Sequence, residues 1–120
     1  MNHKLILTLF FTSVAVLCTQ TVFAQASGNP AAGQAKYQMF CATCHGPTGK
    51  GDGVAANGLT PKPRNFTDKA AMAQKTDAQL KKVIQLGGAA NGLSPSMPPW
   101  GSALSEQDIA NVIAYIRSLK

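Results

Sequence analysis

The sequence predicts an all-α domain with long loops, preceded by a cleavable leader. Three segments have the three-to-four spacing of apolar residues that marks amphipathic helices, and each has recognisable boundary residues. The connecting segments, including the glycine-rich stretch 46–53, are rich in Gly and Pro, and no run has the alternating pattern of a half-buried strand. Long loops are unusual in a compact domain unless they have a role such as surrounding a ligand.

Residues 1–24 have the pattern of a secretory signal peptide. A positive residue near the start is followed by an apolar run over residues 5–17, and small or apolar residues precede a cleavage point after Ala24. A retained membrane anchor and lipoprotein processing at Cys18 are the alternatives, but the apolar run is short for a bilayer span of about 20 residues. We therefore expect export and a mature domain over residues 25–120, without stable membrane insertion.

The chain is basic, with 11 Lys and Arg residues against 5 Asp and Glu residues among its 120. Cleavage of the leader removes Lys4 and leaves 96 residues with a net charge of +5. A positive surface speeds the encounter with acidic partners in a salt-dependent way. The basic residues form no dense cluster of the kind that binds nucleic acid. The charge therefore favours acidic protein partners.

The first helix of the domain is expected over about residues 30–40. Asn29 is a good N-cap, and Pro30 suits the first turn of a helix. Gly33 and Tyr37 lie on one face of this helix. A glycine inside a helix costs about 0.5–1 kcal/mol relative to alanine, and close approach by another helix is one compensation.

Two further helices are expected to begin at Thr76 and Ser105. In each, the residue three positions later, Gln79 or Asp108, can complete a capping box. Gly87-Gly88 ends the earlier helix, because glycine readily adopts the left-handed conformation found at helix ends. The apolar stripe of the last helix consists of Ile109, Val112, Ile113 and Ile116.

The chemistry of the sequence is concentrated in Cys41-Ala42-Thr43-Cys44-His45. This C-x-x-C-H arrangement is the attachment signature of c-type haem. Two thiols at this spacing can add to the two vinyl groups of haem, and the adjacent histidine then lies under the iron as a ligand. The motif predicts one covalently attached haem c per chain, held by Cys41 and Cys44 and ligated by His45.

Other interpretations of the two cysteines fit less well. A thioredoxin-like redox pair belongs in a βαβ unit, which the sequence lacks. A structural zinc site needs four ligands, and His45 is the only further candidate close by. A disulfide between residues so close in sequence would restrict the unfolded chain little. A scaffold without haem, in which the motif occurs by chance, is the remaining alternative.

Several groups compete for the second axial position on the iron. His45 is the only histidine after the leader, which excludes a second histidine from the same chain. Met97 lies in Ser96-Met97-Pro98-Pro99, whose prolines restrict the backbone and can hold a ligand rigidly. Met39 lies two residues before Cys41, on the attachment side, and Met72 lies in an Ala-rich stretch that fits the core or a helix surface. An open or water-bound site is the remaining alternative. We predict Met97 because of this restricted loop. A methionine opposite histidine raises the reduction potential of the iron.

Further expectations concern the surroundings of the haem. A carbonyl of Pro61 or Pro63 is a candidate to orient the ligating histidine, with a plain extended loop as the alternative. Arg64 is a candidate partner for a haem propionate, although a solvated surface arginine fits it equally well. Phe66 and Trp100 are expected to pack against the haem, and the Trp100 N–H is a candidate donor to a propionate.

With the motif, the methionine loop and the terminal helices in this order, the sequence resembles the class I cytochrome c family over residues 28–120. The resemblance implies three to five short helices with long loops wrapped around one haem. It also implies that the first and last helices cross. Gly33 and Tyr37 would then meet Val112 and Tyr115.

The same resemblance maps the axial ligands of the family onto His45 and Met97. The segment Pro63-Arg64-Asn65-Phe66 is similar to one in bacterial periplasmic members. The implied function is electron transfer by a carrier that is not an enzyme, between redox proteins that dock weakly near the haem edge. A haem subunit of a larger oxidoreductase, or an open-site haem protein that binds a small ligand, are the alternatives. Candidate docking residues are Lys50, Lys62, Lys81 and Lys82.

Overall fold

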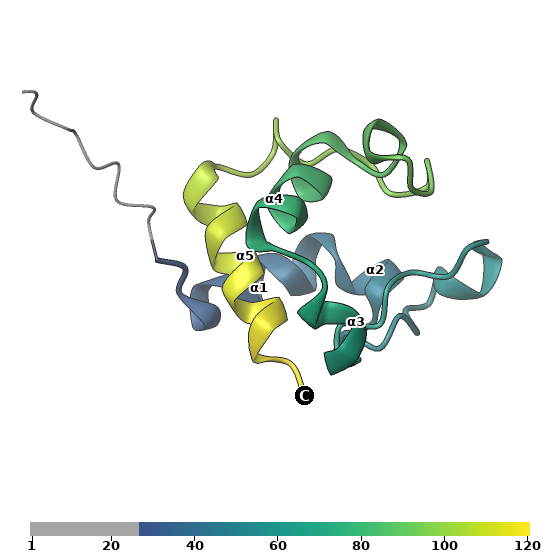
Figure 1. Cartoon of the computed structure of the whole chain (residues 1–120), viewed down its shortest axis with the longest axis horizontal. Helices are drawn as coiled ribbons and strands as arrows, with labels where there is room; N and C mark the ends of the chain where they lie inside the picture. Colours follow the sequence, from purple (N-terminus) through teal and green to yellow (C-terminus); the bar gives the residue numbers. More distant parts are fainter. Residues whose placement is uncertain (1–26) are drawn as a thin grey trace, which may run out of the picture.

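The computed structural model describes residues 27–120. The expected leader, with its cleavage point after Ala24, lies outside these described residues. Within them the chain forms five α-helices and two short 3-10 helices and no strand (Figure 1). The predicted all-α class, with three to five short helices joined by long loops, is confirmed.

The three helices predicted from apolar spacing are present with the expected caps. The Asn29 side chain accepts hydrogen bonds from two N–H groups in the first turn of its helix. Thr76 and Ser105 each complete a capping box, and Gly87 ends the second of these helices with a φ of 78°. The three helices are α1 (Pro30–Phe40), α4 (Asp77–Leu86) and α5 (Glu106–Ser118).

Two short α-helices were not predicted, because neither is long enough to show a periodic apolar face. Helix α2 (Ala42–His45) contains most of the C-x-x-C-H motif, and α3 (Lys69–Ala73) precedes α4. The two 3-10 turns span Ala56–Gly58 and Ala89–Asn91. Among residues 27–120, no helix combines the length and the apolar character that crossing a membrane requires.

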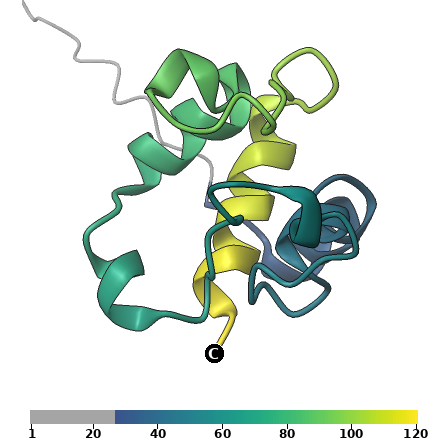
Figure 2. The ribbon, with the colours of Figure 1, turned by 90° about the vertical axis from the view of Figure 1, so that its right-hand side faces the viewer.

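Helix α5 occupies the centre of the domain. Figure 2 shows it in yellow between the blue segments of α1 and α2 and the green segments of α3 and α4. Its buried residues Ile109 and Val112, together with Tyr37 from α1, are the largest fully buried side chains of the core. The rings of Tyr37 and Tyr115 lie 5.0 Å apart. The contact between the first and last helices, expected from the resemblance, is therefore confirmed.

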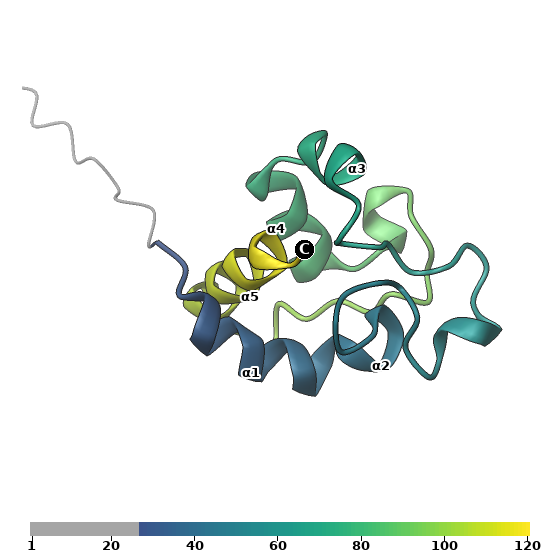
Figure 3. The ribbon, with the colours of Figure 1, turned by 90° about the horizontal axis from the view of Figure 1, so that it is seen from below.

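The crossing of α1 and α5 determines where the cysteine motif lies. Helices α1 and α2 follow each other along one side of the domain, and α3 and α4 lie on the opposite side of α5 (Figure 3). The N–H of Cys41 still donates to the carbonyl of Tyr37 at 2.8 Å, as the last bond of α1. The motif thus follows directly from α1, the helix that packs against the central α5 through the buried Gly33 and Tyr37.

Candidate functional site

A cavity of about 1370 Å³ lies between α2, the extended segment that follows it, α4 and the loop before α5. Its size exceeds the roughly 300–1,000 Å³ of ordinary small-molecule pockets, which suits a large planar group. The four residues predicted to hold the cofactor all line this cavity: Cys41, Cys44, His45 and Met97.

The two thiols are free and half-buried at the cavity wall. The backbone N–H groups of Cys44 and His45 donate to the carbonyl of Cys41 at 3.2 and 2.9 Å, which coils the motif into α2. Burial, and secondarily the neighbouring Cys44, raises the pKa of the Cys41 thiol to about 12. Cys41 therefore keeps its proton at neutral pH. Two unpaired thiols, one at the N-cap of α2 and one within this helix, fit a group that bonds to both.

The His45 ring is oriented by a backbone carbonyl. Its Nδ1 lies 3.1 Å from the carbonyl oxygen of Arg64, and its ring stacks on Phe66 with centroids 4.5 Å apart. Burial lowers the pKa of His45, against the opposing effect of the Arg64 hydrogen bond. A neutral imidazole that donates from Nδ1 leaves Nε2 as the ligating atom.

The expectation that Pro61 or Pro63 supplies the orienting carbonyl is wrong, since Arg64 supplies it. The alignment of this extended segment depends on contacts that sequence spacing does not reveal. The Phe66 N–H donates to the carbonyl of Gly49 at 2.6 Å, which fixes the segment against the glycine-rich loop.

The glycine-rich loop 46–53 has a structural role that the sequence analysis missed. Its backbone turns back onto α2, so that the N–H groups of Gly51 and Gly53 donate to the carbonyls of His45 and Cys44 at 2.8 and 3.1 Å. A Cβ atom at Gly53 would lie 2.2 Å from the carbonyl oxygen of Thr43. The cluster of glycines directly after the motif was the sequence feature that could have indicated this role, because residues without side chains allow the loop backbone to approach α2 closely.

Three methionines line the cavity, and their surroundings differ. Met39 is 70% exposed, and it precedes Cys41 by two residues in α1. Met72, in α3, is only 6% exposed and belongs to the hydrophobic core. Met97 is half-buried in the loop that joins α4 to α5. Of the two positions that its Ala-rich context suggested for Met72, the core or a helix surface, the structure shows the core.

Positive and aromatic side chains complete the cavity wall. Phe66 and Trp100 both line it, as expected of residues that pack against a haem, and Trp100 also packs on Phe40 with centroids 5.2 Å apart. A cationic lining fits a ligand that carries carboxylates. The basic lining residues are Lys62, Arg64, Lys75 and Lys82.

Comparison with known proteins identifies the domain. Residues 30–120 match the cytochrome c family. The chain belongs to this family. It is 41% identical over 96 residues to cytochrome c-554(547) of Halothiobacillus neapolitanus, and this match covers 78% of this chain and 100% of that protein.

This cytochrome c is also similar to part of a larger protein and to a solved structure. It is 36% identical over 92 residues to the Cbb3-type cytochrome c oxidase subunit FixP of Azorhizobium caulinodans, covering 74% of this chain and 29% of that subunit. The solved c-type cytochrome KustC0563 superposes with a TM-score of 0.61 at 25% identity, over 73% of this chain and 96% of that one.

The cofactor of this cytochrome c is covalently attached haem c, and its chemistry is electron transfer. The residues on the cavity wall fit such a group. They provide two unpaired thiols, an imidazole with Nε2 available, and a large cavity with a positive lining.

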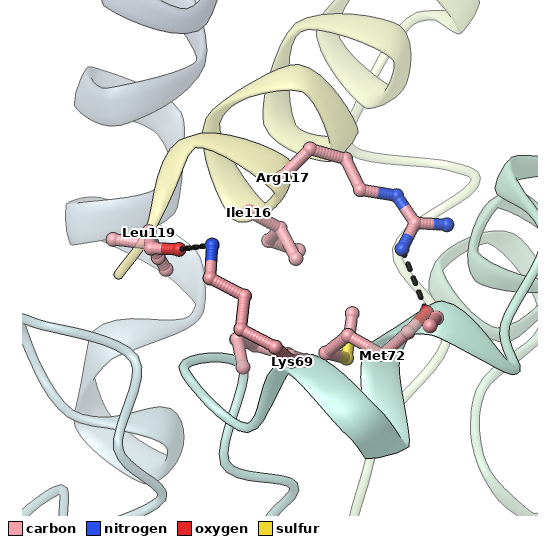
Figure 4. Close-up of a pocket in the computed structure, with 7 residues that line it drawn as sticks. Lys69, Met72, Ile116, Arg117 and Leu119 are labelled. Carbon is pink, nitrogen blue, oxygen red and sulfur yellow. Dashed lines mark hydrogen bonds between the residues drawn. The ribbon is translucent and has the colours of Figure 1, made fainter.

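A second, smaller cavity lies behind the haem cavity of this cytochrome c, with a volume of about 200 Å³. Figure 4 shows Lys69 and Arg117 on either side of it, reaching to Leu119 and Met72. The ammonium of Lys69 donates to the carbonyl of Leu119 at 3.1 Å, and the guanidinium of Arg117 donates to that of Met72 at 2.9 Å. These bonds hold α3 against the end of α5. The wall that separates the two cavities consists of Phe66, Met72 and Ile116.

Proposed function

We propose that this cytochrome is an exported carrier of single electrons, with one haem c held by Cys41 and Cys44 and with His45 and Met97 as axial ligands. The observation that carries the proposal is the convergence of these four side chains on one cavity. A single C-x-x-C-H motif supports one haem per chain. The bound haem supplies an iron that is oxidised and reduced by one electron.

The residues of the chain orient and shield this site. The Arg64 carbonyl holds the His45 ring in one orientation, with Nε2 directed to ligation. Met97 contributes a thioether, which favours the reduced iron and raises its potential. The aromatic side chains of Phe66 and Trp100 add apolar surface to the cavity wall. Low polarity around the site acts in the same direction as the thioether.

Met97 is favoured over the other two methionines by the packing of each. Met72 is part of the wall between the two cavities, and Arg117 anchors its backbone there. Met39 is on the same helix turn as the attachment motif and points mostly to solvent. Met97 lies in the loop that joins α4 to α5, an element separate from the one that carries His45, and its thioether would supply the second ligand to the iron.

The test is the absorption spectrum of the haem-loaded protein, oxidised and reduced. We expect a covalent low-spin haem with a methionine–iron charge-transfer band in the ferric state. The band should disappear in Met97→Ala and persist in the matched variants Met39→Leu and Met72→Leu. Loss of the band in Met72→Leu alone would identify Met72 as the ligand. A high-spin haem that binds carbon monoxide would instead support the open-site alternative.

Export rests on the signal-peptide pattern of residues 1–24. We expect the mature periplasmic protein to begin at Gln25. Mass spectrometry of the intact holoprotein measures this directly, because the mass identifies the first residue. A mass that includes the leader would contradict cleavage and favour the retained anchor.

A fixed subunit of a larger oxidoreductase is the second candidate function. It is favoured by the relation to FixP, an oxidase subunit of which this chain spans 29%. Purification of the tagged chain from its native membrane and periplasmic fractions distinguishes the two functions. A free carrier elutes alone, whereas a fixed subunit elutes with stoichiometric partners.

A further inference from the structure

The loop that contains Met97 is hydrogen-bonded to the C-terminal end of α4. The N–H of Gly88, just past the helix, donates to the carbonyl of Met97 at 2.9 Å. Three residues after Met97, the N–H of Trp100 donates to the carbonyl of Ile84 at 2.9 Å. The last carbonyls of a helix lack partners within the helix. Here the carbonyls of Ile84 and Gln85 are satisfied by N–H groups of the segment that follows Met97.

Gly88 also contacts this loop so closely that no side chain fits. A Cβ atom at Gly88 would lie 1.9 Å from the carbonyl oxygen of Ser94 and 3.4 Å from the Cβ of Met97. The backbone of Gly88 has φ −67° and ψ −45°, which any residue adopts readily. Helix termination therefore explains Gly87, with its φ of 78°. It does not explain Gly88, where the close approach of the loop requires glycine.

Asn91, at the start of the segment that leads to Met97, is hydrogen-bonded to the two glycines that follow α4. Its side-chain Nδ2 donates to the carbonyl of Gly87 at 2.7 Å, and its backbone N–H donates to the carbonyl of Gly88 at 3.0 Å. The N–H of Leu93 donates to the same Gly88 carbonyl at 2.9 Å. The chain thus leaves α4, turns back onto its end and is held there before it reaches Met97.

We propose that Gly88 and Asn91 are positioning residues that set the Met97 thioether in its ligating place. This inference rests on the proposed role of Met97 as the axial ligand. When the loop is displaced from the end of α4, a smaller fraction of molecules has the thioether in position. A competing ligand then binds with a higher apparent affinity, because less of the ligated state must be displaced.

The test uses the ferric, haem-loaded protein and imidazole as the competing ligand. In Gly88→Ala we expect the apparent dissociation constant of imidazole to fall by about tenfold, with a weaker methionine–iron band and a lower reduction potential. Asn91→Ala should change the same three quantities in the same direction, because it loses the side-chain bond to Gly87.

Two glycine variants are the matched controls. A Cβ atom at Gly33 would also lie 1.9 Å from a carbonyl oxygen, that of Asn111, but at the crossing of α1 and α5. Gly33→Ala should therefore destabilise the protein while leaving the band and the imidazole affinity as in the wild type. A Cβ atom at Gly58 would have no heavy atom within 4 Å, so Gly58→Ala should change neither property.

A folded Gly88→Ala protein with the wild-type band, potential and imidazole affinity would overturn the inference. So would an equal change in Gly33→Ala, since the effect would then be general instability. If Gly88→Ala does not fold, Asn91→Ala decides the question by the same readouts. Absence of the band in the wild type, or its survival in Met97→Ala, is a different result and would overturn the proposed function itself.

Discussion

The carbonyl oxygen of Asn111 lies where a side chain at Gly33 would begin, only 1.9 Å from the position of its Cβ atom. Helices α1 and α5 therefore cross with their backbones in contact. The Asn111 side chain adds a second link, because its Oδ1 accepts a hydrogen bond from the N–H of Asn29 at 2.8 Å. This crossing holds α1 in place, and the cysteine motif follows directly from the end of α1.

Gly33→Ala is predicted to reduce the free energy of unfolding by about 1–3 kcal/mol, the usual range for overpacking a closely packed contact. The favourable helix propensity of alanine offsets only part of this effect. Urea denaturation of the holoprotein measures the change, with Gly58→Ala as the control in open space. Equal urea midpoints for Gly33→Ala and Gly58→Ala would mean that α1 and α5 can move apart without loss of stability.

Tyr37→Phe is predicted to destabilise the protein at neutral pH. The buried Tyr37 hydroxyl donates to the carbonyl of Gly46 at 2.8 Å and so links α1 to the loop that follows the motif. Phenylalanine leaves that carbonyl without its partner, at a cost of about 1–3 kcal/mol. Urea denaturation at pH 7 measures the loss. A smaller loss of stability would mean that a water molecule replaces the Tyr37 hydroxyl as donor to the Gly46 carbonyl.

The same tyrosine predicts a loss of stability in alkaline solution. Burial raises the pKa of Tyr37 above its usual value of 10.0, and nearby ionisable groups raise it further. Below pH 10 the Tyr37 hydroxyl keeps its proton in both the folded and the unfolded state. Above pH 10 only the unfolded state releases this proton readily. The free energy of unfolding should therefore fall as the pH rises beyond about 10. Tyr37→Phe should fall less steeply over this range, and parallel curves would refute the assignment.

Arg117→Lys is predicted to loosen α3 from α5. The guanidinium donates to the Met72 carbonyl and to Asp77 Oδ1, both at 2.9 Å, and also to the carbonyl of Lys75. One ammonium cannot satisfy these three acceptors in the geometry of a planar guanidinium. We expect a loss of about 1–3 kcal/mol and faster amide hydrogen exchange in α3. Lys120→Ala, which removes an exposed cation nearby, should leave exchange in α3 unchanged.

Electron transfer to an acidic partner is predicted to depend on the lysines at the cavity wall. Lys62 and Lys82 are exposed and line the haem cavity, whereas Lys81 is engaged in an ion pair with Glu106. Lys82→Glu should slow the bimolecular rate at low salt by about threefold or more, and added salt should reduce the difference. Lys50 is a candidate docking residue that does not line the cavity, so Lys50→Glu should change the rate less and serves as the comparison. A rate that does not respond to salt would contradict electrostatic steering.

Local patterns predicted the elements whose stabilising contacts are close in sequence. The caps at Asn29, Thr76 and Ser105 act within one helical turn, so the beginnings of α1, α4 and α5 could be read directly. The attachment motif spans five consecutive residues, and its chemistry needs no knowledge of the fold. The five-residue α3 is too short to carry a periodic signal, and its position against α5 depends on contacts of Arg117 and Lys69 with distant carbonyls.

The sequence by itself determined the helical class, the motif that binds haem and the set of methionines able to complete the site. Its leader and the ligation by Met97 stay predictions. Only the tertiary structure decided that Arg64 orients His45, that the glycine loop returns onto α2 and that Gly88 carries the Met97 loop. Each of these depends on backbone groups of distant segments meeting at hydrogen-bond distance. Residue type and spacing do not encode that meeting, because any residue can supply a backbone carbonyl.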